Sequence, residues 1–193
     1  MKARFLIFGL TLFLLGCATS KATIDSYLDP NYSADNIKKI AVFPLRNARL
    51  APSEALQTNR EISQAIQRKN SSIQIIGSSE SVDILNENGL AEKWAKFLEN
   101  YAISGIPDAN ILHDIGAALG IDHILQGELI NVYQRDGDGW VRGNTRITIH
   151  YAMISVANNK TVWDASSDGI AGGSYYNPAP PIIDAIRLAQ KKF

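Results

Sequence analysis

The stretch Arg142–Ala157 reads RGNTRITIHYAMISVA, and its alternation of apolar and polar residues determines the class of fold. A period of two is typical of a β-strand with one buried face. We expect the odd positions in and beside this stretch to face the core, namely Val141, Ile147, Ile149, Tyr151 and Met153. We expect the even positions to face outward, namely Arg142, Asn144, Arg146 and His150.

Two flanking segments extend this strand into a sheet. Ile121–Arg135 and Thr161–Ile170 are also rich in strand-forming residues. The sequences DGDG (136–139) and NNK (158–160), which separate the three segments, are strong turn signals. The three segments therefore predict an antiparallel meander.

Two shorter strands and several helices are expected around the meander. The strands are IKKIAVFPL (37–45), whose continuous apolar centre suits a strand covered on both faces, and SIQIIG (72–77). The expected helices are Ser53–Lys69 with Ser53 as its N-cap, Ser79–Asn88, Leu90–Tyr101, Pro107–Leu119, and a last helix with Ile182, Ile186, Ala189 and Phe193 on one face. The sequence therefore predicts an α/β fold, in which a mixed sheet is packed with helices in a single domain over residues 37–193.

The clearest helical period in the chain carries aromatic residues. Apolar side chains recur at the spacing of one helix face, and these are Leu90, Trp94, Phe97, Leu98 and Tyr101. A wide aromatic stripe of this kind is more often part of a core than of a ligand site. We therefore expect this helix to pack on the sheet.

The beginning of the chain has the architecture of a secretory signal. Lys2 and Arg4 precede the apolar run Phe5–Leu15, which is shorter than the ~20 residues of a membrane-spanning helix. Cys17 is the single cysteine of the chain, so it has no partner for an internal disulfide. The order Leu14-Leu15-Gly16-Cys17 resembles a bacterial lipobox, although a small residue is more usual at the second position. The alternative is a signal peptide with an incidental cysteine.

The lipobox resemblance implies a lipid anchor. It implies cleavage after residue 16, a diacylglycerol on the Cys17 thiol and an acyl chain such as palmitate on the new amino end. Ala18 at the second mature position resembles the sorting signal of outer-membrane lipoproteins, whose domains lie in the periplasm. Residues 17–36 are polar and rich in turn-forming residues, so we interpret them as a flexible tether.

The charge balance argues against a nucleic-acid partner. The 193 residues contain 19 Lys and Arg and 19 Asp and Glu, and loss of Lys2 and Arg4 with the signal would leave a slight excess of acid. A nucleic-acid-binding domain needs a basic field. No second hydrophobic stretch is long enough to span a bilayer.

No catalytic, cofactor or metal residues are expected. Asp136 and Asp138 alternate like calcium ligands, but the remaining ligands of a calcium loop are missing. His113, His123 and His150 share no zinc-ligand spacing. The sequence contains neither a Gly-x-Ser-x-Gly elbow nor a complete phosphate loop. We therefore predict that the protein is not an enzyme.

Three segments resemble a superfamily of bacterial envelope lipoproteins. They are IKKIAVFPLRN (37–47), ALGIDHILQGEL (118–129) with Gly120, Asp122 and Gly127, and ISVANNKTVWDA (154–165) with Trp163. The superfamily contains the curli-secretion (CsgG), penicillin-binding-protein-activator (LpoB) and TolB-N-terminal-like proteins, and the chain is most similar to its small periplasmic lipoproteins of unknown function. The resemblance implies a mixed α/β domain that acts in binding or assembly without catalysis.

The turn of the central hairpin is a candidate partner surface. It combines one tryptophan with three arginines, and these are Arg135, Trp140, Arg142 and Arg146. This composition is typical of interface hot spots. The alternative is that Trp140 folds back over the sheet edge while the arginines are merely solvated. Arginine facing lipid at mid-bilayer costs roughly 2–4 kcal/mol, which argues against a membrane-inserted pore wall here.

The predicted function is that of an outer-membrane lipoprotein whose periplasmic domain binds another envelope protein, with self-association also open. Two alternatives stay open. One is a subunit of a curli-type secretion pore. The other is an envelope hydrolase, which a deep pocket lined by His123, His150 and Glu128 would favour.

Overall fold

The computed structural model describes residues 24–47, 49–191 and 193, so the predicted signal peptide and Cys17 lie outside the described residues. Within them, a mixed six-stranded sheet has the order β1-β6-β5-β4-β2-β3. The strands are β1 (Ile24–Leu28), β2 (Lys39–Val42), β3 (Gln74–Ile76), β4 (His123–Arg135), β5 (Asn144–Ser155) and β6 (Lys160–Gly172). The helices are α1 (Pro52–Lys69), α2 (Ser78–Glu87), α3 (Ala91–Ser104), α4 (Ala109–Leu119), α5 (Ile182–Gln190) and the 3-10 helix η1 (Ala34–Asn36). The predicted α/β class is therefore confirmed.

The sheet combines a parallel part with the predicted meander. β4, β5 and β6 are antiparallel neighbours, whereas β2 runs parallel to both β3 and β4. The parallel pairs are connected through helices, as parallel neighbours require. Every strand and helix expected from the sequence is present within a few residues of its expected bounds.

β1 is a strand that the pattern of the sequence does not predict. It pairs with β6 in antiparallel register from Ile24 opposite Ser167 to Leu28 opposite Trp163. Its five residues are all exposed, so they show no alternation of apolar and polar side chains. The segment predicted as a tether to Asn36 therefore contributes an edge strand, and the folded domain includes residues 24–36.

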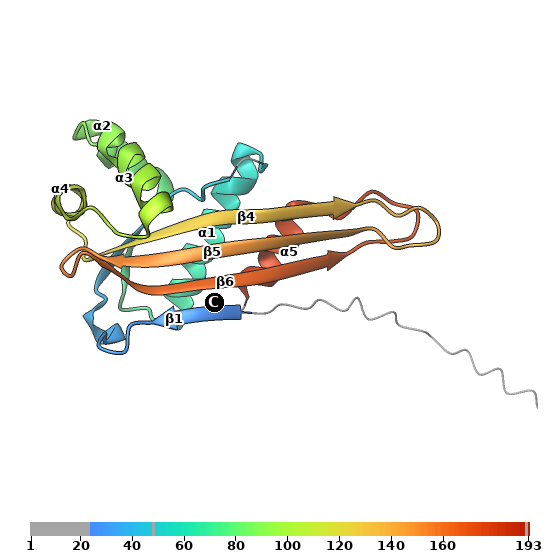
Figure 1. The fold of residues 1–193 in the computed structure, drawn as a ribbon, viewed down its shortest axis with the longest axis horizontal. Helices are drawn as coiled ribbons and strands as arrows, with labels where there is room; N and C mark the ends of the chain where they lie inside the picture. Colours follow the sequence, from blue (N-terminus) through green and yellow to red (C-terminus); the bar gives the residue numbers. More distant parts are fainter. Residues whose placement is uncertain (1–23, 48, 192) are drawn as a thin grey trace, which may run out of the picture.

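Helices cover both faces of the sheet. α1 and α5 pack on one face, behind the sheet in Figure 1, over a core that includes Val42, Ile149 and Ile186. α2, α3 and α4 gather at one end of the opposite face over a second core that includes Phe43, Ile124 and Ile154. Alternate residues of a strand point to opposite faces, so β2 supplies both cores.

The predicted stripe of α3 forms an aromatic stack in the second core. Trp94 lies 4.0 Å from Phe43, measured between ring centroids, and 5.1 Å from Phe97. Phe97 in turn lies 5.7 Å from Tyr101 with the rings nearly parallel. Phe97 is fully buried, and Leu90 and Trp94 are also buried. The expectation that this helix packs against the sheet is therefore confirmed.

Two local expectations are wrong. Val141 is 41% exposed, because it lies in the turn before β5 begins at Asn144 and the alternation of the strand does not extend to it. The N-cap of α1 is Ala51 rather than Ser53, because Pro52 occupies the first helical position and the Glu54 carboxylate accepts a hydrogen bond from the Ala51 backbone. The core positions Ile147, Ile149 and Tyr151 are buried as expected.

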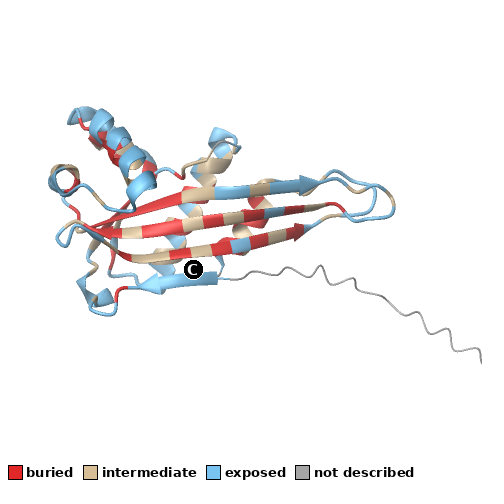
Figure 2. Ribbon diagram, viewed as in Figure 1, coloured by how far each residue is buried: buried red, intermediate tan, exposed pale blue. Residues whose placement is uncertain are grey.

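The meander reaches well beyond the helices. β4 and β6 contain 13 residues each, and 13 residues of strand span about 40 Å. Buried residues concentrate beside the helices, whereas β4 becomes exposed toward the far end of the hairpin (Figure 2). None of the described helices combines the length and apolar character needed to cross a bilayer. The β4–β5 turn therefore stands at the end of a projecting arm (Figure 1).

Candidate interaction surface

The turn between β4 and β5 is held by its own aspartates. One carboxylate oxygen of Asp138 accepts hydrogen bonds from the backbone N–H groups of Trp140, at 2.9 Å, and Val141, at 2.7 Å. These bonds hold the pKa of Asp138 below its ordinary value, because they favour the charged carboxylate. Asp136 accepts a hydrogen bond at 2.7 Å from the backbone of Ala179. Both aspartates therefore serve to fix the turn and its neighbouring loop.

A second loop, residues 173–179, lies directly against the turn. Backbone hydrogen bonds join Gly137 to Asn177 at 3.0 Å and Gly139 to Tyr175 at 2.6 Å. A Cβ atom at position 137 would lie 2.4 Å from the backbone oxygen of Ser174, so this approach requires glycine. The turn and the loop thus form one hydrogen-bonded double loop.

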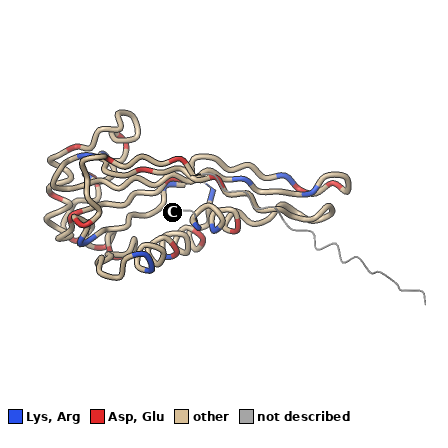
Figure 3. The backbone as a smooth tube through the Cα atoms, turned by 90° about the horizontal axis from the view of Figure 1, so that it is seen from below, with Lys and Arg blue, Asp and Glu red and all other residues tan. Residues whose placement is uncertain are grey.

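The double loop displays aromatic and basic side chains to solvent. Trp140 is 91% exposed and Tyr176 is 83% exposed. The Arg142 guanidinium lies 4.9 Å from the centre of the Tyr175 ring, which is a cation–π arrangement. We call Trp140, Arg142, Tyr175 and Tyr176 the aromatic tip. Acidic and basic residues mix along this projecting end, so its charge has no single sign (Figure 3).

The structure brings together three of the four residues predicted for the partner surface. The Arg135 guanidinium donates a hydrogen bond to the Arg142 carbonyl oxygen at 3.2 Å, in the same turn as Trp140. Arg146 instead lies within β5, opposite Tyr133 and away from the turn. The high exposure of Trp140 shows that its side chain does not fold back over the sheet edge.

The two tyrosines of the aromatic tip were not predicted as part of the partner surface. The pair lies in a loop rich in glycine and proline, GGSYYNPAPP (172–181), about which periodicity says nothing. The loop reaches the turn because β6 pairs with β5 so that Gly172 lies opposite Asn144. Two adjacent tyrosines in a loop could have suggested an interaction surface. Their position beside Trp140, however, depends on the register of β5 and β6.

The residues considered for a hydrolase do not share a pocket. Glu128 and His150 lie opposite each other on β4 and β5 and line a hollow of about 350 Å³. His123 lies on the other face of β4, where its Nε2 is hydrogen-bonded with the Tyr32 hydroxyl. Its Nδ1 contacts the Asp122 carboxylate. Glu128 pairs with Arg46 at 3.6 Å. The three groups are thus placed at two separate sites.

Comparison with protein-family models and with curated proteins finds no match. Among solved structures, a PelC dodecamer from Paraburkholderia phytofirmans is similar, with 14% identity over 89% of this chain and 94% of that chain and a TM-score of 0.50. Lipoprotein GNA1162 from Neisseria meningitidis has 14% identity over 69% of this chain and 83% of that chain, with a TM-score of 0.43. The LpoB C-terminal domain from Salmonella enterica has 14% identity over 69% of this chain and 82% of that chain, with a TM-score of 0.41. The resemblance to the curli-secretion and TolB-N-terminal-like proteins stays a prediction. The chain is thus similar in fold to one protomer of PelC.

Proposed function

We propose that this protein is an outer-membrane lipoprotein whose periplasmic domain binds another envelope protein through the aromatic tip, without catalysis. The observation that carries the proposal is the exposed indole of Trp140 on a hydrogen-bonded double loop. Because Trp140 and the two tyrosines are exposed at the end of an arm, they bury little area and contribute little to the stability of the fold. Exposed aromatic groups of this kind mark contact sites.

The geometry of the aromatic tip favours binding in two ways. Trp, Tyr and Arg are enriched among the residues that dominate binding energy at interfaces. The cross-loop hydrogen bonds order the tip before any partner arrives, and preorganisation reduces the entropy lost on binding. A partner could therefore gain most of its affinity from few contacts.

The absence of catalysis is part of the proposal. The Glu128 carboxylate is paired with Arg46, and His123 lies on the other face of the sheet from His150. A hydrolase needs its acid, base and nucleophile within hydrogen-bond reach of one another. The arrangement of these groups supports a binding role.

Replacing Trp140 by Ala is expected to leave stability nearly unchanged and to weaken partner binding by about 2 kcal/mol, roughly 30-fold. The indole is 91% exposed, so its loss removes little buried area from the fold. A photo-crosslinking residue in place of the neighbouring Val141, which is 41% exposed, keeps Trp140 and identifies the partner in intact cells. Affinity for that partner is then measured beside circular dichroism melts.

Tyr27→Ala is the matched control, because Tyr27 is a half-exposed aromatic residue on β1, far along the chain from the aromatic tip. It should change neither affinity nor melting. An adduct with twice the mass of the chain would indicate self-association instead. Equal loss of affinity in both variants, or unfolding of Trp140→Ala, would contradict the interface.

Replacing Cys17 by Ser is expected to abolish labelling by a fatty-acid analogue and to release the domain into the soluble periplasmic fraction. Each buried methylene contributes about 0.8 kcal/mol to membrane attachment, so the acyl chains of a lipoprotein hold it permanently. Fractionation and labelling measure both effects. A variant that still fractionates with outer membranes would show that the anchor assignment is wrong.

A further inference from the structure

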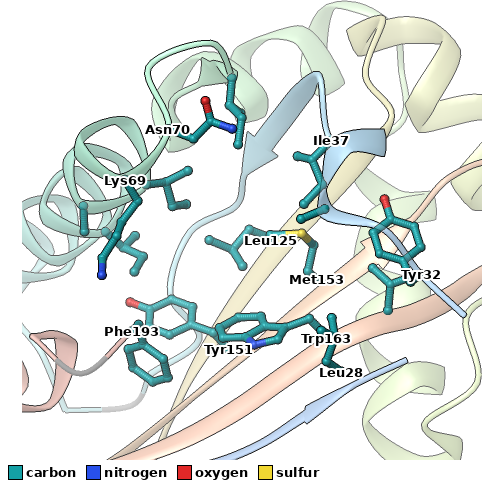
Figure 4. Close-up of a pocket in the computed structure, with 16 residues that line it drawn as sticks. Leu28, Tyr32, Ile37, Lys69, Asn70, Leu125, Tyr151, Met153, Trp163 and Phe193 are labelled. Carbon is teal, nitrogen blue, oxygen red and sulfur yellow. The ribbon is translucent and has the colours of Figure 1, made fainter. Parts of the chain in front are cut away.

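The first core contains an apolar cavity that the proposed partner binding does not use. It has a volume of about 260 Å³ and lies between α1, the sheet and the segment that contains η1 (Figure 4). Its floor is formed by sheet residues that include Leu125, Met153 and Trp163. Phe193 closes one side, with its ring edge-on to Tyr151 and Trp163.

The cavity follows from the small residues that face it. α1 presents Ile62, Ala65 and Ile66 to the sheet, and the methyl group of Ala65 leaves space that a larger side chain would fill. Native interiors contain few voids larger than a water molecule, and empty apolar volume destabilises a protein. An engineered cavity of about 150 Å³ with apolar walls stays dry and binds benzene. This larger cavity is therefore suited to an apolar ligand.

The polar atoms around the cavity determine what kind of ligand fits. The Tyr32 hydroxyl is hydrogen-bonded with His123, the Tyr151 hydroxyl accepts from Gln190 at 2.7 Å, and the Asn70 side-chain oxygen accepts from Ser72. These oxygens are already satisfied within the protein. They hold the walls in place and leave the interior apolar.

Lys69, at the rim of the cavity, is the polar lining residue without such a partner among the described residues. It is exposed, it lines the cavity, and its amino end points toward the side where Tyr151 and Phe193 lie (Figure 4). Among the described residues, no carboxylate pairs with its ammonium group. A ligand with an apolar body and one anionic end would satisfy both the walls and this charge.

We propose that the cavity binds a single acyl chain that ends in a carboxylate, with the chain between α1 and the sheet and the carboxylate beside Lys69. This proposal does not depend on the aromatic tip. The two functions can fail separately, because Trp140 does not line the cavity.

Decanoate is the probe, and the protein is the full chain with Cys17→Ser, which removes the thiol to which an acyl group could be attached. The chain has two methionines, Met1 and Met153, and Met153 lines the cavity. We expect the ¹³C-labelled methyl resonance of Met153 to shift saturably as decanoate is added. An unchanged Met153 resonance at saturating decanoate would overturn the proposal.

Filling the cavity should block the probe. Ala65→Phe is expected to weaken decanoate binding about tenfold or more, since each lost buried methylene reduces affinity severalfold. Gln64→Phe places the same ring on the exposed side of α1 and should leave the affinity within about twofold. If Ala65→Phe does not fold, Ala34→Trp narrows the exposed rim instead and should weaken binding similarly. Equal affinities in wild type and both cavity variants would contradict the site.

Removing the charge of Lys69 should distinguish the contribution of the ligand's carboxylate from that of its acyl chain. Lys69→Gln is expected to weaken decanoate binding about two- to fivefold, the scale of an exposed ion pair. It should not change the affinity for decanol, which has the same chain without the charge. Lys96→Gln removes an exposed lysine from α3, on the opposite face of the sheet, and should change neither affinity. Equal effects of Lys69→Gln on both probes would show that the carboxylate is not recognised there.

Discussion

Replacing Phe97 by Ala is expected to lower the free energy of unfolding by about 3–5 kcal/mol, a large part of the 5–15 kcal/mol of a typical domain. Phe97 is fully buried and lies between Trp94 and Tyr101 in the aromatic stack of α3. Removal of its ring loses both the buried area and the ring contacts, and it leaves a cavity that backbone relaxation fills only in part. Urea denaturation of the two proteins measures the difference.

Ile103→Ala is the control on the same helix, because Ile103 is 83% exposed. Its effect should be within about 0.5 kcal/mol, as for other exposed positions. Comparable stabilities of wild type and Phe97→Ala would show that α3 is not packed on the sheet in solution. The helix would then be available for a partner or a membrane surface.

The elements that could be predicted are those in which side-chain burial follows the period of the backbone. The stripe from Leu90 to Tyr101 and the alternation from Ile147 to Met153 are both reproduced in the two cores. In each case the apolar side chains repeat with the period of the backbone and lie on a buried face, so the chemical pattern of the sequence records the geometry.

The elements that could not be predicted depend on contacts between distant parts of the chain. β1 has both faces exposed, and it is a strand only because its backbone pairs with β6. The same limit applies to the aromatic tip. Trp140 was evident as a candidate, but its exposure and its position beside Tyr175 and Tyr176 follow from the register of β5 and β6.

The cavity is the feature that is hardest to predict from the local sequence. In the sequence, Ala65 is a residue with a high helix propensity, as is common in helices. Lys69 is a basic residue in the last turn of its helix, which is also common. The empty volume arises because Ala65 and larger side chains of the sheet, such as Leu125 and Trp163, line the same space across the distance between α1 and the sheet. No local pattern in the sequence encodes that distance.

Replacing Gly169 by Ala is expected to destabilise the domain by about 3 kcal/mol or more, at the upper end for overpacking. Gly169 lies in β6 where α5 crosses the sheet. A Cβ atom there would lie 1.9 Å from the backbone oxygen of Ala185 and 3.1 Å from the backbone nitrogen of Ala189. Backbone atoms cannot rotate away as a side chain can, so the whole of α5 would have to move.

Movement of α5 would separate much of the first core. Ala185, Ile186 and Ala189 are fully buried against the sheet, and the Ser167 hydroxyl donates a hydrogen bond to the Ala189 carbonyl oxygen at 3.0 Å. Gly172→Ala is the matched control three residues along the same strand, where an added Cβ meets nothing within 4 Å. It should be neutral or slightly stabilising, since alanine lowers the entropy of the unfolded chain. Thermal melts of both variants measure the contrast, and equal melting midpoints would mean that α5 does not cross β6 at this point.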